Sequence, residues 1–79
     1  MPSYEILWCT EAQQERVTLP AEIRTALEKF VEGLKRNPKQ GTYNKYYDRY
    51  TAEFDYGLVH YAVVDHVLKV IMFRIVGVY

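Results

Sequence analysis

The chain has 79 residues, which predicts a single domain over residues 1–79. Hydrophobic residues make up 49% and charged residues 25%, a composition that excludes a disordered chain. The single cysteine, Cys9, excludes an internal disulfide and a multi-cysteine zinc site, and the zero net charge argues against a protein that coats nucleic acid. No apolar run is long enough to span a membrane and the first residues lack a signal-peptide pattern, so we expect a cytoplasmic protein without membrane contact.

The chain opens with a predicted strand and a short helix. Residues 4–9 form an apolar run with mild alternation, which is typical of a strand. Thr10 and Gln13 stand at the spacing of a capping box with Thr10 as the N-cap, which predicts a helix to about Val17.

A second helix is predicted over residues 20–36. Pro20 suits its first turn, because the missing backbone N–H has no helical partner there. The residue before a proline is pushed out of the helical region, so Asn37-Pro38 ends the helix. One face of this helix is apolar at helical spacing, with Ile23, Leu27, Phe30, Val31 and Leu34.

The second half of the chain changes to a strand period. Strands are predicted at residues 50–54, 58–64 and 67–76, and the last two are joined by a tight turn at Asp65-His66. The element order is therefore β-α-α-β-β-β, an α+β fold with an antiparallel sheet and helices packed on one face. The side chains expected to be buried are Ile23, Leu27, Phe30, Leu34, Val59, Tyr61, Val63 and Val70.

Charge is unevenly spread along the chain, although its sum is zero. Residues 1–34, 35–50 and 51–79 carry −3, +4 and −1, and the basic segment is also rich in tyrosine. Basic side chains pair with phosphates and tyrosine rings stack on unpaired bases, whereas the plainer interpretation is a solvated loop whose tyrosines cover the sheet. The candidate RNA-binding residues are Lys39, Lys45, Tyr46, Tyr47 and Arg49, with Tyr43 beside them.

Arg74 and His60 are two polar residues within the last two predicted strands, and each has a plain and a functional interpretation. A charge within an apolar strand must meet solvent, a carboxylate or a ligand, so Arg74 either pairs with Glu53 or Asp55 or anchors a phosphate. Glu53 beside Arg74 would serve as a general base for a ribose hydroxyl. His60 is either a general acid or base, or a hydrogen-bonded residue on the sheet face. Spacing and residue types predict no metal site and no cofactor.

The chain resembles the RelE/ParE family of bacterial toxins from type II toxin–antitoxin modules. The similarity lies in the element order, in Leu19-Pro20 before the second helix and Asn37-Pro38 after it, and in the hairpin and last strand, residues 56–65 and 70–75. Family members end near a Val-Tyr pair, matched by Val78-Tyr79. The resemblance implies a metal-independent, ribosome-dependent mRNA endoribonuclease held inactive by a cognate antitoxin, with Arg74 at the scissile phosphate and Tyr79 as a hydroxyl donor.

Two departures from the family pattern favour a weakened activity. Gly57 stands where ribonuclease members usually place an arginine, and the basic residues before the C-terminal tyrosine are missing. The alternative function is therefore a non-catalytic interaction module on the same fold, or a gyrase-targeting toxin neutralised by an antitoxin. A homodimer is the alternative use of any exposed apolar surface.

Overall fold

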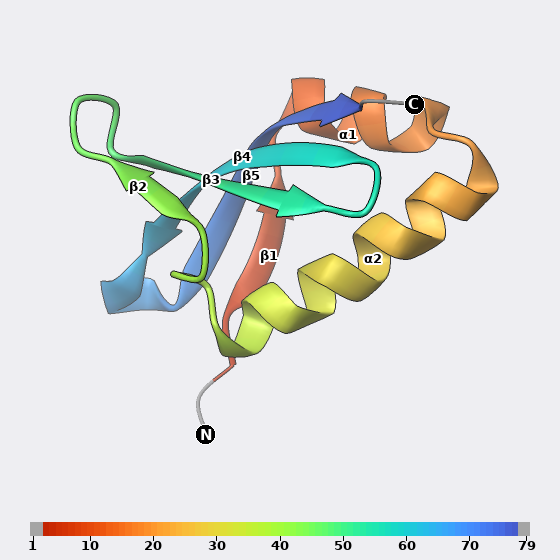
Figure 1. Ribbon diagram of the computed structural model, residues 1–79. Helices are drawn as coiled ribbons and strands as arrows, with labels where there is room; N and C mark the ends of the chain where they lie inside the picture. The colour runs from red at the N-terminus through yellow and green to blue at the C-terminus, as the bar shows by residue number, and fades with distance from the viewer. Residues whose placement is uncertain (1–2, 78–79) are drawn as a thin grey trace.

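The computed structural model describes residues 3–77 as a five-stranded mixed sheet with two helices (Figure 1). The strands lie in the order β1-β5-β4-β3-β2. The α+β class and the element order are confirmed, with β2 as a short strand that was not predicted. The elements are β1 (Glu5–Trp8), α1 (Thr10–Thr18), α2 (Ala21–Arg36), β2 (Thr42–Asn44), β3 (Arg49–Phe54), β4 (Gly57–Val64), a 3-10 turn (Asp65–Val67) and β5 (Lys69–Gly77).

Helix α2 packs on one face of the sheet, because its apolar residues recur every third or fourth position. Leu27 and Leu34 are fully buried in one cluster with Tyr61 of β4. Six of the eight side chains expected in the core are buried. The other two, Phe30 and Val63, are half-buried at its margin. The core consists of Ala12, Leu19, Ile23, Leu27, Val31, Leu34, Ala52, Val59, Tyr61, Val70, Met72 and Ile75.

The sheet is mixed because β1 runs parallel to β5, while the predicted strands β3, β4 and β5 are antiparallel as expected. No neighbouring strand was predicted for residues 4–9. Parallel neighbours need a long crossover connection, and here it includes both helices and three strands. Such a pairing leaves no local turn signal in the sequence, so only the strand itself was predictable.

Two local boundaries differ from the predictions. The β4–β5 turn is longer than two residues, because a 3-10 turn is followed by Leu68 in the left-handed conformation, with φ 54°. Strand β5 therefore begins at Lys69. Thr10 is the first residue of α1 and Cys9 is its N-cap, without a side-chain capping hydrogen bond, so the predicted capping box is wrong by one position.

Helix α1 lies beside the part of β5 that β1 does not reach. β1 ends at Trp8, whereas β5 continues to Gly77. The Cys9 thiol donates a hydrogen bond to the carbonyl oxygen of Phe73 at 3.2 Å, and the backbone N–H of Ile75 donates to Glu15 Oε1 at 3.1 Å. Side chains of the segment from the N-cap to α1 thus satisfy backbone groups that a neighbouring strand would otherwise pair.

A β-bulge in β5 places two consecutive side chains on the same face of the sheet. His60 pairs with Arg74 but Tyr61 pairs with Met72, so Phe73 is an extra residue in β5. Met72 is buried in the core, whereas Phe73 and Arg74 both line a groove on the opposite face. The bulge therefore brings an aromatic ring and a guanidinium together on the face turned away from α2.

Candidate functional site

The face of the sheet opposite α2, called the outer face below, carries a groove of about 420 Å³. Thr51 and His60 lie on this face because they alternate along their strands with core residues. The groove spans β2, β3, β4 and β5, so it exists only once the strands have paired. This outer groove is lined by Asn44, Tyr47, Arg49, Thr51, His60, Phe73 and Arg74.

Thr51, His60 and Arg74 occupy adjacent positions on three neighbouring strands. The Thr51 hydroxyl and His60 Nδ1 are 2.9 Å apart, within a hydrogen bond that holds the imidazole ring. This bond engages Nδ1 and leaves Nε2 as the other ring nitrogen. The interpretation of His60 as a hydrogen-bonded residue on the sheet face is therefore confirmed, and the same side chain lines the groove.

Arg49 forms one wall of the outer groove. Its guanidinium lies over the Phe73 ring, 4.0 Å from the ring centroid, in a cation–π contact. Its Nη1 donates hydrogen bonds to the carbonyl oxygens of Tyr47 at 3.0 Å and Asp48 at 3.3 Å. The Arg49 charge is thus held in place without a carboxylate partner in these contacts, which suits binding of a phosphate.

Arg74 is paired with Glu15 of α1, and the predicted pairing with Glu53 or Asp55 is wrong. The Arg74 Nε lies 3.2 Å from Glu15 Oε1, and Nη2 lies 3.3 Å from Oε2. Glu11 Oε2 lies further away, 4.0 Å from Nε. The hydrogen bond to Glu15, followed by its negative charge, raises the pKa of Arg74 above its ordinary value, so the side chain stays charged.

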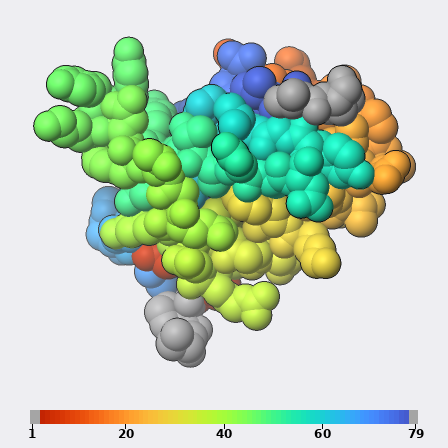
Figure 2. All heavy atoms as spheres, in the orientation of Figure 1, coloured from red at the N-terminus to blue at the C-terminus, as the bar shows by residue number. Residues whose placement is uncertain are grey.

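The tip of the β2–β3 hairpin projects from the body of the protein (Figure 2, green, upper left). Tyr46 and Tyr47 are 85% and 72% exposed, so the interpretation that they cover the sheet does not hold for them. The Lys45 ammonium lies 5.8 Å from the centroid of the Tyr46 ring. Tyr43 and Tyr50 do pack on the sheet, where Tyr50 stacks on Tyr61 with centroids 5.5 Å apart.

Four of the predicted site residues do not line the groove, namely Lys39, Lys45, Tyr46 and Glu53, and of these Lys45 and Tyr46 line a separate hollow at the hairpin tip. Lys39 pairs with Asp65 at 2.7 Å, and this hydrogen bond raises the pKa of Lys39. Glu53 is exposed and pairs in register with Leu58 rather than with the His60–Arg74 position, so it is not beside Arg74. Tyr79 lies outside the described residues.

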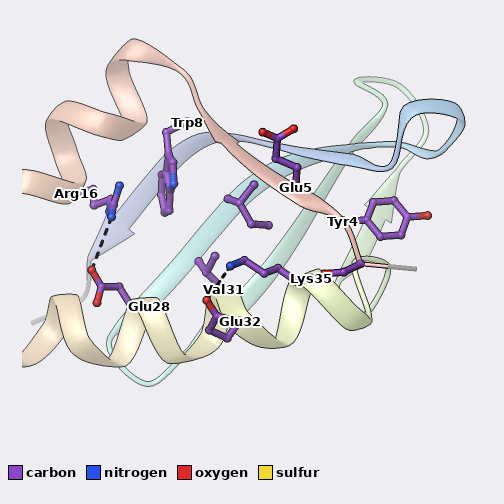
Figure 3. Close-up of a pocket in the computed structure, with 10 residues that line it drawn as sticks. Tyr4, Glu5, Trp8, Arg16, Glu28, Val31, Glu32 and Lys35 are labelled. Atoms are coloured by element: carbon purple, nitrogen blue, oxygen red, sulfur yellow. Dashed lines mark hydrogen bonds and ion pairs between the residues drawn. The ribbon is translucent and has the colours of Figure 1, made fainter. Parts of the chain in front are cut away.

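A second hollow, of about 460 Å³, lies between β1 and α2 (Figure 3). Four of its charged side chains pair with one another, since Arg16 lies 3.7 Å from Glu28 and Lys35 lies 2.8 Å from Glu32, and the fifth, Glu5, pairs with Lys69. The Arg16 guanidinium also lies 4.7 Å from the centroid of Trp8. This hollow offers paired charges and an indole rather than a group suited to acid–base chemistry, so the outer groove is the better candidate site.

Asn44, Thr51 and Phe73 complete the outer groove but were not among the predicted site residues. The alternation of β3 carried a signal for Thr51, since Ala52 next to it suits the core. Phe73 carried a similar signal, since it alternates with the buried Met72, whereas Arg74 shares its face only because of the bulge. The Glu15 contact was also missed, since a helix residue and a strand residue far apart in the chain meet there only after folding.

The fold is similar to that of toxin–antitoxin complexes of the RelBE type. The match to a chain of the RelBE2 complex of Mycobacterium tuberculosis has a TM-score of 0.86 at 22% identity and covers 95% of this chain and 98% of that one. The match to the intact RelBE complex of Escherichia coli has a TM-score of 0.77 at 19% identity and covers 98% of each chain. No family model and no curated protein matches the sequence. The chain therefore shares its fold with chains of these RelBE complexes, in agreement with the fold that the resemblance implied.

Proposed function

We propose that this chain is the toxin component of a bacterial toxin–antitoxin module and a ribosome-dependent mRNA endoribonuclease that needs no metal. The observation that carries the proposal is the outer groove, where Arg49, His60 and Arg74 line one hollow beside the exposed rings of Tyr46 and Tyr47. Arginine pairs with phosphates and tyrosine stacks on bases, so this surface suits single-stranded RNA. The fold shared with RelBE complexes supports the same function.

The proposed chemistry is acid–base strand scission. A base takes the proton of the ribose 2′-hydroxyl, the 2′-oxygen attacks the phosphorus, and an acid protonates the 5′-oxygen that leaves. His60 takes the base role in place of Glu53, because His60 lines the groove with Arg74. Arg74 stabilises the charge that develops on the phosphate, and Tyr79 is the proposed hydroxyl donor. Lys45 and Arg49 hold neighbouring phosphates.

The proposed partner is an antitoxin, as in the RelBE complexes that share this fold. A small domain has limited apolar surface to bury in its own core, and several large apolar side chains are exposed, among them Leu7, Val17 and Val76. Covering this surface stabilises the toxin, and a homodimer is the alternative use of it. Light scattering of the purified protein with and without its antitoxin separates the two, and a stable monomer that gains nothing from an antitoxin contradicts both.

Induction in a bacterium tests the ribonuclease proposal most directly. The wild-type chain should arrest growth and fragment messenger RNA, and Arg74→Ala should abolish fragmentation while the fold survives, because Arg74 is exposed. Arg36→Ala is the matched control, since it removes an exposed arginine from the end of α2, on the other side of the sheet. Full messenger RNA cleavage by the Arg74→Ala variant contradicts the catalytic role of Arg74.

The second candidate function is a non-catalytic interaction module, or a toxin that targets gyrase. Gly57 favours it, because a Cβ atom there would lie 2.1 Å from the carbonyl oxygen of Val76. The backbone of β5 thus leaves no room for the arginine that ribonuclease members place at this position. Growth arrest with intact messenger RNA supports this second function over the first.

A further inference from the structure

Glu15 makes an unusual double contact at the bulge of β5. Its Oε1 accepts a hydrogen bond from the backbone N–H of Ile75 at 3.1 Å and lies 3.2 Å from Arg74 Nε. Its Oε2 lies 3.3 Å from Arg74 Nη2. One carboxylate therefore binds both the backbone just after the bulge and the guanidinium that the bulge turns outward. The Glu15 side chain is 29% exposed, whereas that of Arg74 is 54% exposed.

The contact leaves part of the Arg74 guanidinium available to a ligand. A guanidinium has five N–H donors, and a side-on carboxylate engages the Nε donor and one donor of Nη2. The remaining donors, both on Nη1 and one on Nη2, can still bind phosphate oxygens. Arg74 also lines the outer groove, so these donors belong to a side chain at the proposed RNA site.

Resting on the proposed function, we infer that Glu15 is a positioning residue for Arg74, which holds the guanidinium at the outer groove with its remaining donors directed to an RNA phosphate. The alternative is that Glu15 merely neutralises Arg74 and weakens phosphate binding. The hydrogen bond from the Ile75 N–H argues against this alternative, because it fixes the Glu15 carboxylate to the backbone of β5. A long side chain fixed in this way loses less freedom when it binds.

Glu11 provides a matched control. It lies on the same helix as Glu15, is 72% exposed, and comes only within 4.0 Å of Arg74 Nε. Glu11→Gln and Glu15→Gln each remove one negative charge near the groove. A purely electrostatic effect therefore changes RNA binding in the same direction in both variants, toward tighter binding. A positioning role makes the two variants differ, because a glutamine has one acceptor oxygen and an NH2 donor, so it cannot offer one oxygen to Arg74 Nε and a second to Nη2.

The test measures binding of a short single-stranded RNA oligonucleotide and cleavage of ribosome-bound messenger RNA. Glu15→Ala and Glu15→Gln should weaken binding about 10-fold and lower cleavage by about 10- to 100-fold, the scale expected for a misplaced contact. Glu11→Gln should change neither by more than about twofold. In the Arg74→Ala background, Glu15→Ala should have no further effect, because Glu15 acts through Arg74. Melting curves check folding, and Glu15→Gln keeps an oxygen for the Ile75 N–H where Glu15→Ala does not.

The outcomes separate the two proposals. Tighter RNA binding by Glu15→Gln, equal to that of Glu11→Gln, overturns the positioning role in favour of neutralisation. A further loss on adding Glu15→Ala to Arg74→Ala also overturns it. If the wild-type chain binds the oligonucleotide but cleaves nothing, the ribonuclease proposal fails and the binding data alone decide the role of Glu15. If the wild-type chain neither binds nor cleaves, both proposals fall.

Discussion

The two faces of the sheet differ in burial and in the residue types that they carry. On the α2 side, Leu27 and Tyr61 are fully buried, and every residue of the core cluster is apolar or aromatic. On the outer face, Thr51 and His60 are half-exposed, and the residues that line the groove come from β2, β3, β4 and the bulged strand β5, with Tyr47 from the β2–β3 turn. The first face determines stability and the second carries the proposed chemistry. Substitutions on the two faces should therefore separate the free energy of unfolding from RNA binding.

The largest effect is expected for Leu27→Ala on the α2 side. Leu27 has no exposed surface and lies in the centre of α2, so its truncation leaves a cavity that costs about 2–5 kcal/mol. Lys29→Ala, an exposed change on the same helix, should stay within about 0.5 kcal/mol. Denaturant unfolding followed by circular dichroism measures both. Equal stability of the two variants would mean that α2 does not anchor the core.

Gly57→Ala should have the next largest effect, at the contact between β4 and β5. The new Cβ would lie 2.1 Å from the Val76 carbonyl oxygen, so the strands must separate at a cost of about 2–3 kcal/mol. Gly33→Ala is the matched control, because its Cβ would come no closer than 3.8 Å to Gln40. Because Gly33 lies within α2, alanine should add about 0.5–1 kcal/mol of stability there. A lower free energy of unfolding for Gly57→Ala and a higher one for Gly33→Ala confirm the close approach of the strands at Gly57. A Gly57→Ala variant as stable as the wild type would show that this close approach does not explain the missing arginine.

The sequence predicted the inner face well because burial imposes a period that can be read from the chain. Ile23, Leu27 and Leu34 were placed in the core from helical spacing, and Val59 and Tyr61 from strand alternation. The pattern failed at the margin, for Phe30 and Val63, where a side chain is covered on one side only. Periodicity states which side of an element is apolar, but not how far the neighbouring elements extend over it.

The outer groove was predicted only in part, because long-range pairing assembles it. Arg49 and Arg74 were selected by residue type, and both line the groove. Their partners were not predictable, since the register of three strands, the bulge at Phe73 and the placement of α1 decide them. Lys39 shows the converse, because it belongs to the basic segment but pairs with Asp65, far along the chain. Composition therefore identified a basic segment, but folding places Arg49 at the outer groove and Lys39 beside Asp65.

Removing the exposed rings of the hairpin tip should weaken RNA binding without changing stability. Tyr46 and Tyr47 are 85% and 72% exposed, so Tyr46→Ala and Tyr47→Ala should each lose about 1–2 kcal/mol of oligonucleotide affinity at an unchanged melting temperature. Tyr46→Phe and Tyr47→Phe keep the stacking ring and should bind like the wild type. Fluorescence anisotropy with a single-stranded RNA makes the measurement. Unchanged affinity in both alanine variants would remove the tip from the proposed RNA surface.

The smallest effect is expected at Asp65, in a polar cluster that joins the residue before β1, the loop after α2 and the β4–β5 turn. Asp65 accepts hydrogen bonds from Lys39 Nζ and Tyr4 Oη, each at 2.7 Å. The hydrogen bond from Lys39, followed by that from Tyr4, lowers the pKa of the Asp65 carboxyl below its ordinary value of 3.8. A lowered pKa in the folded state means that folding favours the ionised carboxylate.

The sign of the pH dependence follows from that direction. The stabilisation by Asp65 is complete above the unfolded pKa of 3.8 and is lost as the pH falls through the lower folded pKa. Lys39 acts in the opposite range, because its raised pKa makes its contribution complete below the unfolded value of 10.5 and lost as the pH rises through the folded one. The melting temperature of Asp65→Asn should therefore lie slightly below that of the wild type at neutral pH, since both groups are exposed and screened by solvent. The difference should vanish in acid, where the wild-type carboxyl is itself protonated. A difference that persists unchanged in acid would assign the contribution of Asp65 to packing at the β4–β5 turn rather than to its charge.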